Sequence, residues 1–141
     1  MIYEIKPYLS VNNFFFGKKQ AEIKKLCGAP FSVKIDNIQE IIVESREACE
    51  LVYEEKKLAY ITLNKHVIPV VRGIKIFEEG ALEQLMLMDK DHLIGLQYSI
   101  FRSLGVCVGG LGKKKIPEGR IVNAFAKEKI EFFEFFVTDN G

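Results

Sequence analysis

Residues 14–30 constrain the fold more than any other part of the chain, and their sequence is FFFGKKQAEIKKLCGAP. Three consecutive phenylalanines suit a mostly buried strand, because each ring needs an apolar neighbour. A glycine ends this run, and residues 18–27 change to the spacing of a helix with one apolar stripe. Gly28 then stands where a helix C-cap belongs, and Pro30 prevents the helix from continuing.

The apolar stripe of this helix predicts which of its side chains face the core. Ala21, Ile23, Leu26 and Cys27 lie within the stripe, and lysines and a glutamate occupy the rest of the surface. We interpret the lysines as a solvated helix surface rather than as a basic binding face. Leu26 is therefore expected to be buried, and Leu26→Asp to cost several kcal/mol, because it would bury an unpaired charge.

Most of the remaining chain has the patterns of short strands. Alternating apolar and polar residues predict a half-buried strand over residues 31–36, and β-branched residues favour a strand over residues 38–45. A hairpin with a charged tip is expected over residues 48–63. Further strands are expected over residues 1–8 at a sheet edge, 67–77, 96–101, 104–111 and 120–126, with a connection over residues 91–95.

A second helix is expected over residues 81–89, opened by Gly80, with an apolar stripe of leucines and methionines. Residues 130–137 contain four phenylalanines and must be covered, as a final strand or as a short amphipathic helix. Twice a bulky strand leads through glycine into a short helix and several strands, which suggests a duplicated helix-plus-meander unit. The sequence thus predicts one α+β domain over residues 1–141, an antiparallel β-sheet meander with two short helices packed on one face.

Composition narrows the class of protein. The chain has 141 residues, which fits one domain with a real core. The net charge is +1, so the overall charge of the chain does not indicate binding to nucleic acid or to a membrane. No apolar run reaches bilayer-spanning length and the N-terminus lacks a signal-peptide pattern, so we expect a cytoplasmic protein. In that compartment Cys27, Cys49 and Cys107 are expected as small buried hydrophobes without disulfides.

The sequence contains no pattern that indicates a catalytic or cofactor site. Neither His66 nor His92 has a nearby cysteine or serine in a nucleophile motif. Asp89, Asp91 and His92 could supply metal ligands, but no second ligand cluster accompanies them, which favours a polar loop after a helix. We therefore expect no catalytic residues, no metal and no cofactor.

The glycine-rich segment VGGLGKKK, residues 108–115, invites comparison with phosphate-binding loops. A P-loop would need glycine in place of Cys107 and serine or threonine in place of Lys114. The segment is better interpreted as a flexible hairpin loop.

An acidic stretch spans residues 44–55 and includes Glu44, Glu47, Glu50 and Glu54. Paired carboxylates can hydrolyse glycosides, but only at a fixed separation that a sequence does not give. A solvated sheet face is one interpretation, and an acidic interface for a basic protein partner is another. The basic loop formed by Lys113, Lys114 and Lys115 is the contrasting candidate surface.

Four segments, in this order, resemble a group of small bacterial proteins: FFFGKKQAEIKKLCGAP, ELVYEEKKLAYITL, YSIFRSLGVCVGGL and GRIVNAFAK. The group consists of immunity proteins encoded beside polymorphic toxins, including contact-dependent growth inhibition systems. In that group an F-x-F-G-x-S-like helix start leads to L-G-x-P, and an aromatic-rich F-x-x-L-G-[IV] segment comes later. The resemblance covers most of the chain.

This resemblance implies a stoichiometric inhibitor that binds the toxic C-terminal domain of a cognate toxin, often a nuclease. Such a mechanism needs no catalytic residue, no direct contact with nucleic acid and no membrane, and the resemblance assigns no binding residue. Two other classes stay open. One is a small carboxylate-dependent hydrolase using residues 44–54 or Asp91 with His92, and the other is a homo-oligomeric interaction domain using the aromatic C-terminus.

Overall fold

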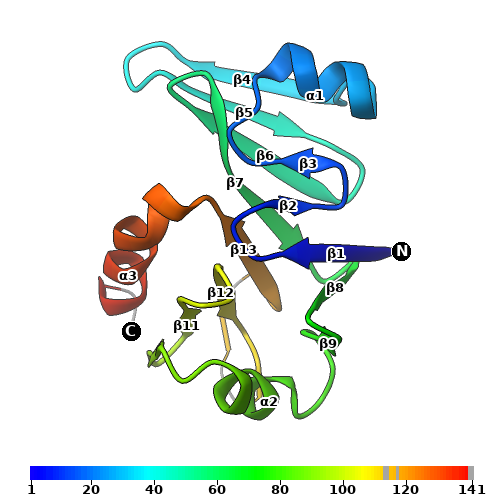
Figure 1. Ribbon diagram of the computed structural model, residues 1–141. Coiled ribbons are helices and arrows are strands. Elements are labelled where there is room, and N and C mark those ends of the chain that lie inside the picture. Colours follow the sequence, from blue (N-terminus) through cyan, green and yellow to red (C-terminus); the bar gives the residue numbers. More distant parts are fainter. Residues whose placement is uncertain (113–114, 117, 140–141) are drawn as a thin grey trace.

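The computed structural model describes residues 1–112, 115–116 and 118–139 of the chain. These residues form an α+β fold with three α-helices and 13 strands, which confirms the predicted fold class. The strands form one sheet of eight strands and one of five, whereas the sequence predicted a single meander (Figure 1).

The eight-stranded sheet is antiparallel throughout and consists of two four-stranded meanders. Its strand order is β10-β11-β12-β13-β7-β6-β5-β4. The meanders meet at their last strands, β13 and β7, which pair from Ile121 opposite Asn64 to Phe125 opposite Tyr60. The strands are β4 (Ser32–Asp36), β5 (Ile41–Ser45), β6 (Cys49–Glu54), β7 (Lys57–Asn64), β10 (His92–Ile94), β11 (Tyr98–Phe101), β12 (Val106–Gly109) and β13 (Ile121–Phe125).

The five-stranded sheet joins the beginnings of the two halves of the chain. Its order is β3-β2-β1-β8-β9, with β1 (Ile2–Lys6), β2 (Ser10–Val11), β3 (Phe14–Phe15), β8 (Ile68–Val71) and β9 (Ile74–Lys75). The expectation that the N-terminal strand lies at a sheet edge is wrong, because β1 lies between β2 and β8 and runs parallel to β8. Tyr3 and Ile5 of β1 are buried and Ile2 is exposed, as the alternation of a strand requires.

The order of elements repeats along the chain. The first half contains β1 to β3, helix α1 (Gln20–Cys27) and the meander β4 to β7, and the second contains β8, β9, helix α2 (Ala81–Met88) and the meander β10 to β13. The predicted helix-plus-meander repeat is therefore present in the architecture. Helix α3 (Ile130–Asp139), preceded by a 3₁₀ turn at Lys127–Lys129, follows the second meander only, and the first half has no such helix.

Two apolar cores lie on opposite faces of the large sheet. The first contains Ile23 of α1 and Leu85 of α2 together with residues of the small sheet, and the second contains Phe133 and Val137 of α3. Successive residues of β12 alternate between them, because strand side chains point to opposite faces. Helices α1 and α2 thus share one face, as predicted, and α3 covers the other (Figure 1).

Several segments correct the sequence-based expectations locally. Residues 92–94 form strand β10 where a connection was expected, and Ile38 lies in the β4–β5 turn and not in a strand. Residues 130–139 are helical, so of the two predicted alternatives the helix is confirmed. Phe14 and Phe15 are only half-buried. Cys49 and Cys107 are buried, Cys27 is half-buried, and all three are free thiols. No helix in the described part of the chain is long and apolar enough to cross a lipid bilayer.

Helix α1 also corrects the expected burial of Leu26. The helix packs through Ile23, which is fully buried, whereas Leu26 is 59% exposed. Residues three positions apart on a helix differ by about 60° in direction, so a narrow contact buries one of them and leaves the other at its margin. The prediction that Leu26 is buried is therefore wrong, and with it the reason for a large loss in Leu26→Asp.

We expect Leu26→Asp to change the free energy of unfolding by no more than about 0.5 kcal/mol, the range for exposed positions. Ile23→Val, which removes one buried methylene, should cost about 0.5–1.5 kcal/mol. Urea denaturation of both variants measures the difference. A loss of several kcal/mol in Leu26→Asp would show that Leu26 is buried after all.

Candidate interaction surface

Among the described residues, no helix covers one of the two faces of the first meander. In the second meander, α3 packs over β11 and β13 on the face of the second core. Its Phe133 stacks there on Phe125, with ring centroids 4.7 Å apart. Figure 1 shows α3 beside the lower part of the sheet, away from β4 and β5. Because the first half has no counterpart of α3, the same face of β4 to β6 stays open.

Strand pairing identifies the side chains on this open face. Lys34 lies opposite Val43, and Ser45 lies opposite Glu50. Since residues two apart on a strand point the same way, Ile41, Val43 and Ser45 lie on one side of β5. All of these side chains are half-buried or exposed. The open face includes Lys34, Ile41, Val43, Ser45 and Glu50, together with the buried Val52 opposite Val43.

The open face combines apolar and charged side chains in the way that protein interfaces do. Val43 lies at its centre, between Lys34 and Val52, and Ile41 lies at one end of β5. Lys34 and Glu50 add a charge of each sign. Interfaces have an apolar centre and a polar rim, and their fully buried part is depleted in charge. The arrangement suits a protein partner better than a small molecule, which needs a concave pocket.

The turn between β4 and β5 holds the outer hairpin in place. The Asp36 carboxylate accepts hydrogen bonds from the backbone amides of Ile38 at 3.0 Å and Gln39 at 3.1 Å. Glu40 adopts a left-handed backbone conformation with φ 56°. Such side-chain bonds are a common reason for aspartate at the start of a turn. They fix the backbone of the turn that joins β4 to β5.

The four predicted acidic residues do not form one patch. Glu44 is 2% exposed and points to the first core, because it lies opposite Leu51. Glu50 and Glu54 lie on the same face of β6, but Glu54, opposite Ile41, forms an ion pair with Lys129 at 2.8 Å. Glu47 is exposed in the turn between β5 and β6. The prediction that Glu44 lies on a binding surface is therefore wrong, because its side chain is buried.

Glu44 belongs to an internal network that attaches α1 to the sheet. Its carboxylate accepts hydrogen bonds from Tyr53 Oη at 3.0 Å and Gln20 Nε2 at 2.9 Å, and it pairs with Arg46 at 3.3 Å. The Arg46 guanidinium also donates to the carbonyl of Gly28 at 2.9 Å. Burial, followed by the Glu44 charge, raises the pKa of Tyr53, so its hydroxyl keeps its proton and donates.

The basic loop lies largely outside the described residues. Lys113 and Lys114 are not among them, and Lys115 is exposed. The glycines before this loop belong to a hairpin, as expected, because Gly109 ends β12 and Gly110 has φ 72°. A Cβ at Gly110 would lie 2.5 Å from the carbonyl oxygen of Gly119, so this close approach requires glycine.

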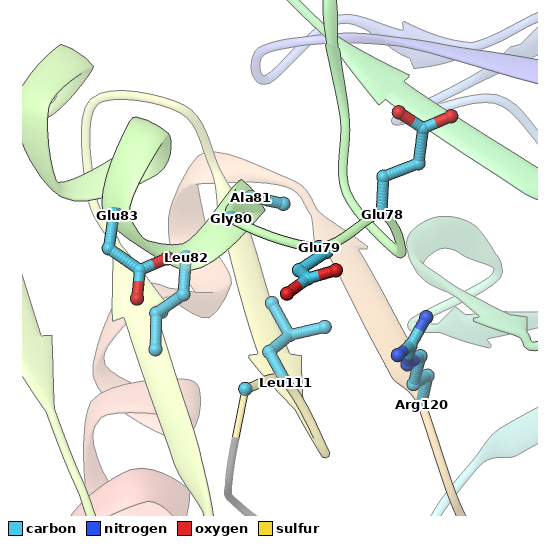
Figure 2. A pocket seen from close by; sticks show the side chains of 9 residues that line it. Glu78, Glu79, Gly80, Ala81, Leu82, Glu83, Leu111 and Arg120 are labelled. Atoms are coloured by element: carbon cyan, nitrogen blue, oxygen red, sulfur yellow. The ribbon is translucent and has the colours of Figure 1, made fainter.

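A cavity of about 480 Å³ lies between this hairpin and the start of α2 (Figure 2). Its lining includes Leu111 and Gly112 of the hairpin and the carboxylates of Glu78, Glu79 and Glu83. Its one lining cation among the described residues is Arg120, whose guanidinium donates to the carbonyl of Phe77. Three carboxylates repel a phosphate, so the cavity does not favour the phosphate-binding interpretation of the glycine-rich loop.

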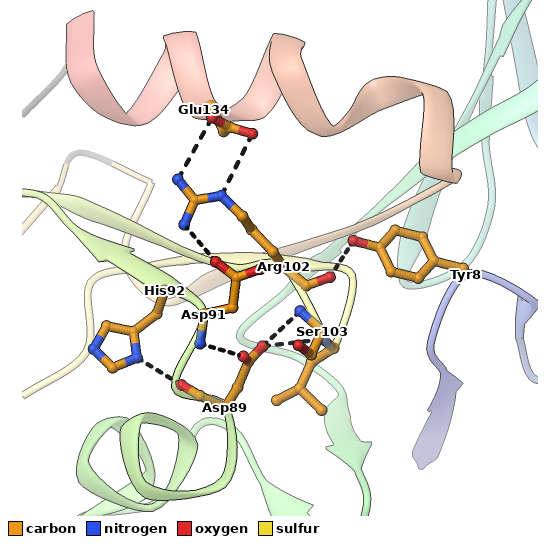
Figure 3. A network of polar contacts seen from close by, with 8 residues as sticks. Tyr8, Asp89, Asp91, His92, Arg102, Ser103 and Glu134 are labelled. Carbon is orange, nitrogen blue, oxygen red and sulfur yellow. Dashed lines mark hydrogen bonds and ion pairs between the residues drawn. The ribbon is translucent and has the colours of Figure 1, made fainter.

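Asp89, Asp91 and His92 take structural roles in a polar network (Figure 3). The buried Asp89 carboxylate accepts hydrogen bonds from the amides of Ser103 at 2.8 Å and Leu104 at 3.1 Å. Asp91 pairs with Arg102 at 3.2 Å, and His92 Nδ1 lies 2.6 Å from the carbonyl oxygen of Asp89. The described residues contain no cluster of three His, Cys, Asp or Glu side chains able to hold a metal.

The same network attaches α3 to the sheet. Arg102 pairs with Glu134 of α3 at 3.4 Å, and the Tyr8 hydroxyl donates to the carbonyl of Arg102 (Figure 3). Burial is the main cause that raises the pKa of Tyr8 to about 12. The ion pair lies beside the apolar contacts of Phe133 and Val137, through which α3 packs on this face of the sheet.

Comparison with known proteins gives no match: no protein-family model, no curated protein and no solved structure is similar to this chain. The segments that carry the resemblance to immunity proteins lie in β3 with α1, in the β6–β7 hairpin, in the β11–β12 hairpin and in β13. They are fold-forming segments. The open face was missed in the sequence because its residues come from three strands and its exposure depends on where α3 packs.

Proposed function

We propose that this protein is an immunity protein that neutralises the toxic C-terminal domain of a polymorphic toxin by binding it stoichiometrically. The observation that carries the proposal is the open face of β4 to β6, a sheet surface with apolar centre and charged margin. The resemblance of the fold-forming segments supplies the kind of partner. A toxin domain that acts on nucleic acid would bring a basic surface, which Glu50 on the open face would attract.

The hydrolase alternative is supported less well by the geometry. Both oxygens of Glu44 are engaged, Oε1 by Arg46 and Tyr53 and Oε2 by Gln20. Asp91 is held by Arg102, and His92 by the backbone of Asp89. A general acid or base must reach the proton that it transfers, and these groups already have internal partners.

Co-expression with the toxin domain encoded beside this gene tests the proposal. We expect the pair to co-purify as a 1:1 complex and the cells to survive. Absence of a toxin gene in that position, or a toxin that stays free and active in the presence of this protein, would contradict it.

Two substitutions test whether the open face is the binding surface. Val43→Asp should weaken the complex by about tenfold or more, since every 1.4 kcal/mol is a factor of ten and a charge at an interface centre is costly. Glu50→Lys should mainly slow association and reduce its dependence on salt. Surface plasmon resonance at two ionic strengths measures both effects.

The matched control is Leu87→Asp, the same kind of change at an exposed residue of α2. It should bind as the wild type does. Equal weakening in Leu87→Asp and Val43→Asp would show that the effect is not specific to the open face.

A further inference from the structure

Strand β4 ends the eight-stranded sheet and has β5 as its one neighbour among the described residues. All five of its residues are exposed. At the other end of the sheet, β10 is only three residues long, and its Leu93 packs against the second core. An exposed strand edge presents unpaired amides and carbonyls, a template for pairing with another chain.

The side of β4 that faces the first core is apolar. Val33 lies opposite Glu44 and Ile35 opposite Ile42, so both point to the face of the first core. Ile35 is 62% exposed and Phe31, just before the strand, is 77% exposed. Phe31 lines a hollow with Tyr3, a residue of the first core, which places its ring on the same face.

The same edge carries a hollow at its other end. It has a volume of about 220 Å³ and is lined by two apolar residues, Ile35 and Ile42, and by four polar ones, Asp36, Asn37, Glu40 and Lys56. A cavity of roughly 150 Å³ is enough to bind benzene. The edge therefore has an exposed aromatic ring at one end and a hollow large enough for such a ring at the other.

We propose that two copies of this chain form a dimer by antiparallel pairing of their β4 strands, with Val33 of each copy at the two-fold axis. Residues whose numbers sum to 66 then lie opposite each other. Phe31 of each copy lies opposite Ile35 of the other, beside the hollow of the other copy. A ring at one end and a hollow at the other make the edge complementary to itself, as a two-fold interface requires.

Charge and the position of Phe31 together distinguish this pairing from the neighbouring ones. Pairing about Lys34 would place two lysines directly opposite each other, which is destabilising. Pairing about Ile35 would place Lys34 opposite Asp36, but it would leave Phe31 beyond the paired strands. Pairing about Val33 places Lys34 opposite Ser32 and also uses both rings and both hollows.

Charge substitutions at the axis test the dimer without a toxin. Light scattering coupled to size-exclusion chromatography should give twice the 16.1 kDa of one chain for the wild type. Val33→Lys and Val33→Glu should each be monomeric, because each places two like charges opposite each other. An equimolar mixture of the two variants should return to the dimer mass, since lysine then faces glutamate.

Ile38→Lys is the matched control, because Ile38 lies in the same hairpin but outside the paired residues. It should remain dimeric. A monomeric wild type would overturn the proposal, and so would a dimer that survives Val33→Lys or a mixture that stays monomeric. A chain that is monomeric alone but binds the toxin would overturn this dimer and leave the proposed function standing.

Discussion

Arg46→Ala is expected to lower the free energy of unfolding by about 3–5 kcal/mol, the range for removing one partner of a buried ion pair. The Glu44 carboxylate is 2% exposed in the wild type, and the substitution removes the cation that pairs with it. Tyr53 and Gln20 still donate to it, but neither carries a positive charge. The loss is large because an uncompensated charge in the interior is costly.

Arg46 also connects parts of the chain that are distant in sequence. Its guanidinium donates to the carbonyls of Cys27 and Gly28 at the end of α1, and it lies 5.4 Å from the ring centroid of Phe14. The variant should therefore loosen α1 as well as destabilise the whole fold. Hydrogen exchange of the α1 amides, alongside urea denaturation, measures the two effects separately.

Glu47→Ala is the control for Arg46→Ala. Glu47 is next in sequence but exposed, so its removal should change stability by no more than about 0.5 kcal/mol. The double variant Glu44→Gln with Arg46→Ala should recover part of the loss, because it removes the buried charge together with its partner. No recovery would show that Arg46 acts through its bonds to α1 rather than through Glu44.

The sequence predicted elements whose signals are local. The β6–β7 hairpin was predicted from two β-rich runs around a charged tip, and Glu55 and Lys56 at that tip both have positive φ, as a tight hairpin turn requires. Helix α2 begins directly after Gly80, where its apolar stripe begins. In these segments spacing and turn residues are sufficient, because they depend on near neighbours.

The errors concern packing between distant segments. Nothing within residues 1–8 shows that β1 pairs with β8, more than 60 residues later. Val33 and Ile35 alternate like the residues of a half-buried strand, yet they are exposed because β4 ends the sheet. Glu44 has the sequence context of a surface charge, and only the fold brings Arg46, Tyr53 and Gln20 around it. Burial of this kind depends on topology, which short-range patterns do not encode.

Phe133→Ala is the second substitution with a large expected effect, about 3–5 kcal/mol for removing a buried aromatic ring. Phe133 is buried at the centre of the second core. Its ring stacks on Phe125 at 4.7 Å and meets Tyr60 edge-on at 5.2 Å. Such ring pairs add to the apolar area that is buried.

The position of Phe133 also determines how the loss would appear. Helix α3 lies at the C-terminal end of the described chain and packs on the sheet through Phe133 and Val137, with the Arg102–Glu134 ion pair beside them. This ion pair is half-buried, with side chains 25% and 36% exposed. A pair so open to solvent contributes little by itself, about 0–1 kcal/mol, so it cannot hold the helix once the ring is gone. We expect α3 to exchange its amides faster than β13 in the variant, whereas in the wild type both should be protected.

Phe135→Ala, two residues further along the same helix at an exposed position, should leave stability within about 0.5 kcal/mol. If both variants lost the same stability, α3 would not be held by the face that contains Phe133.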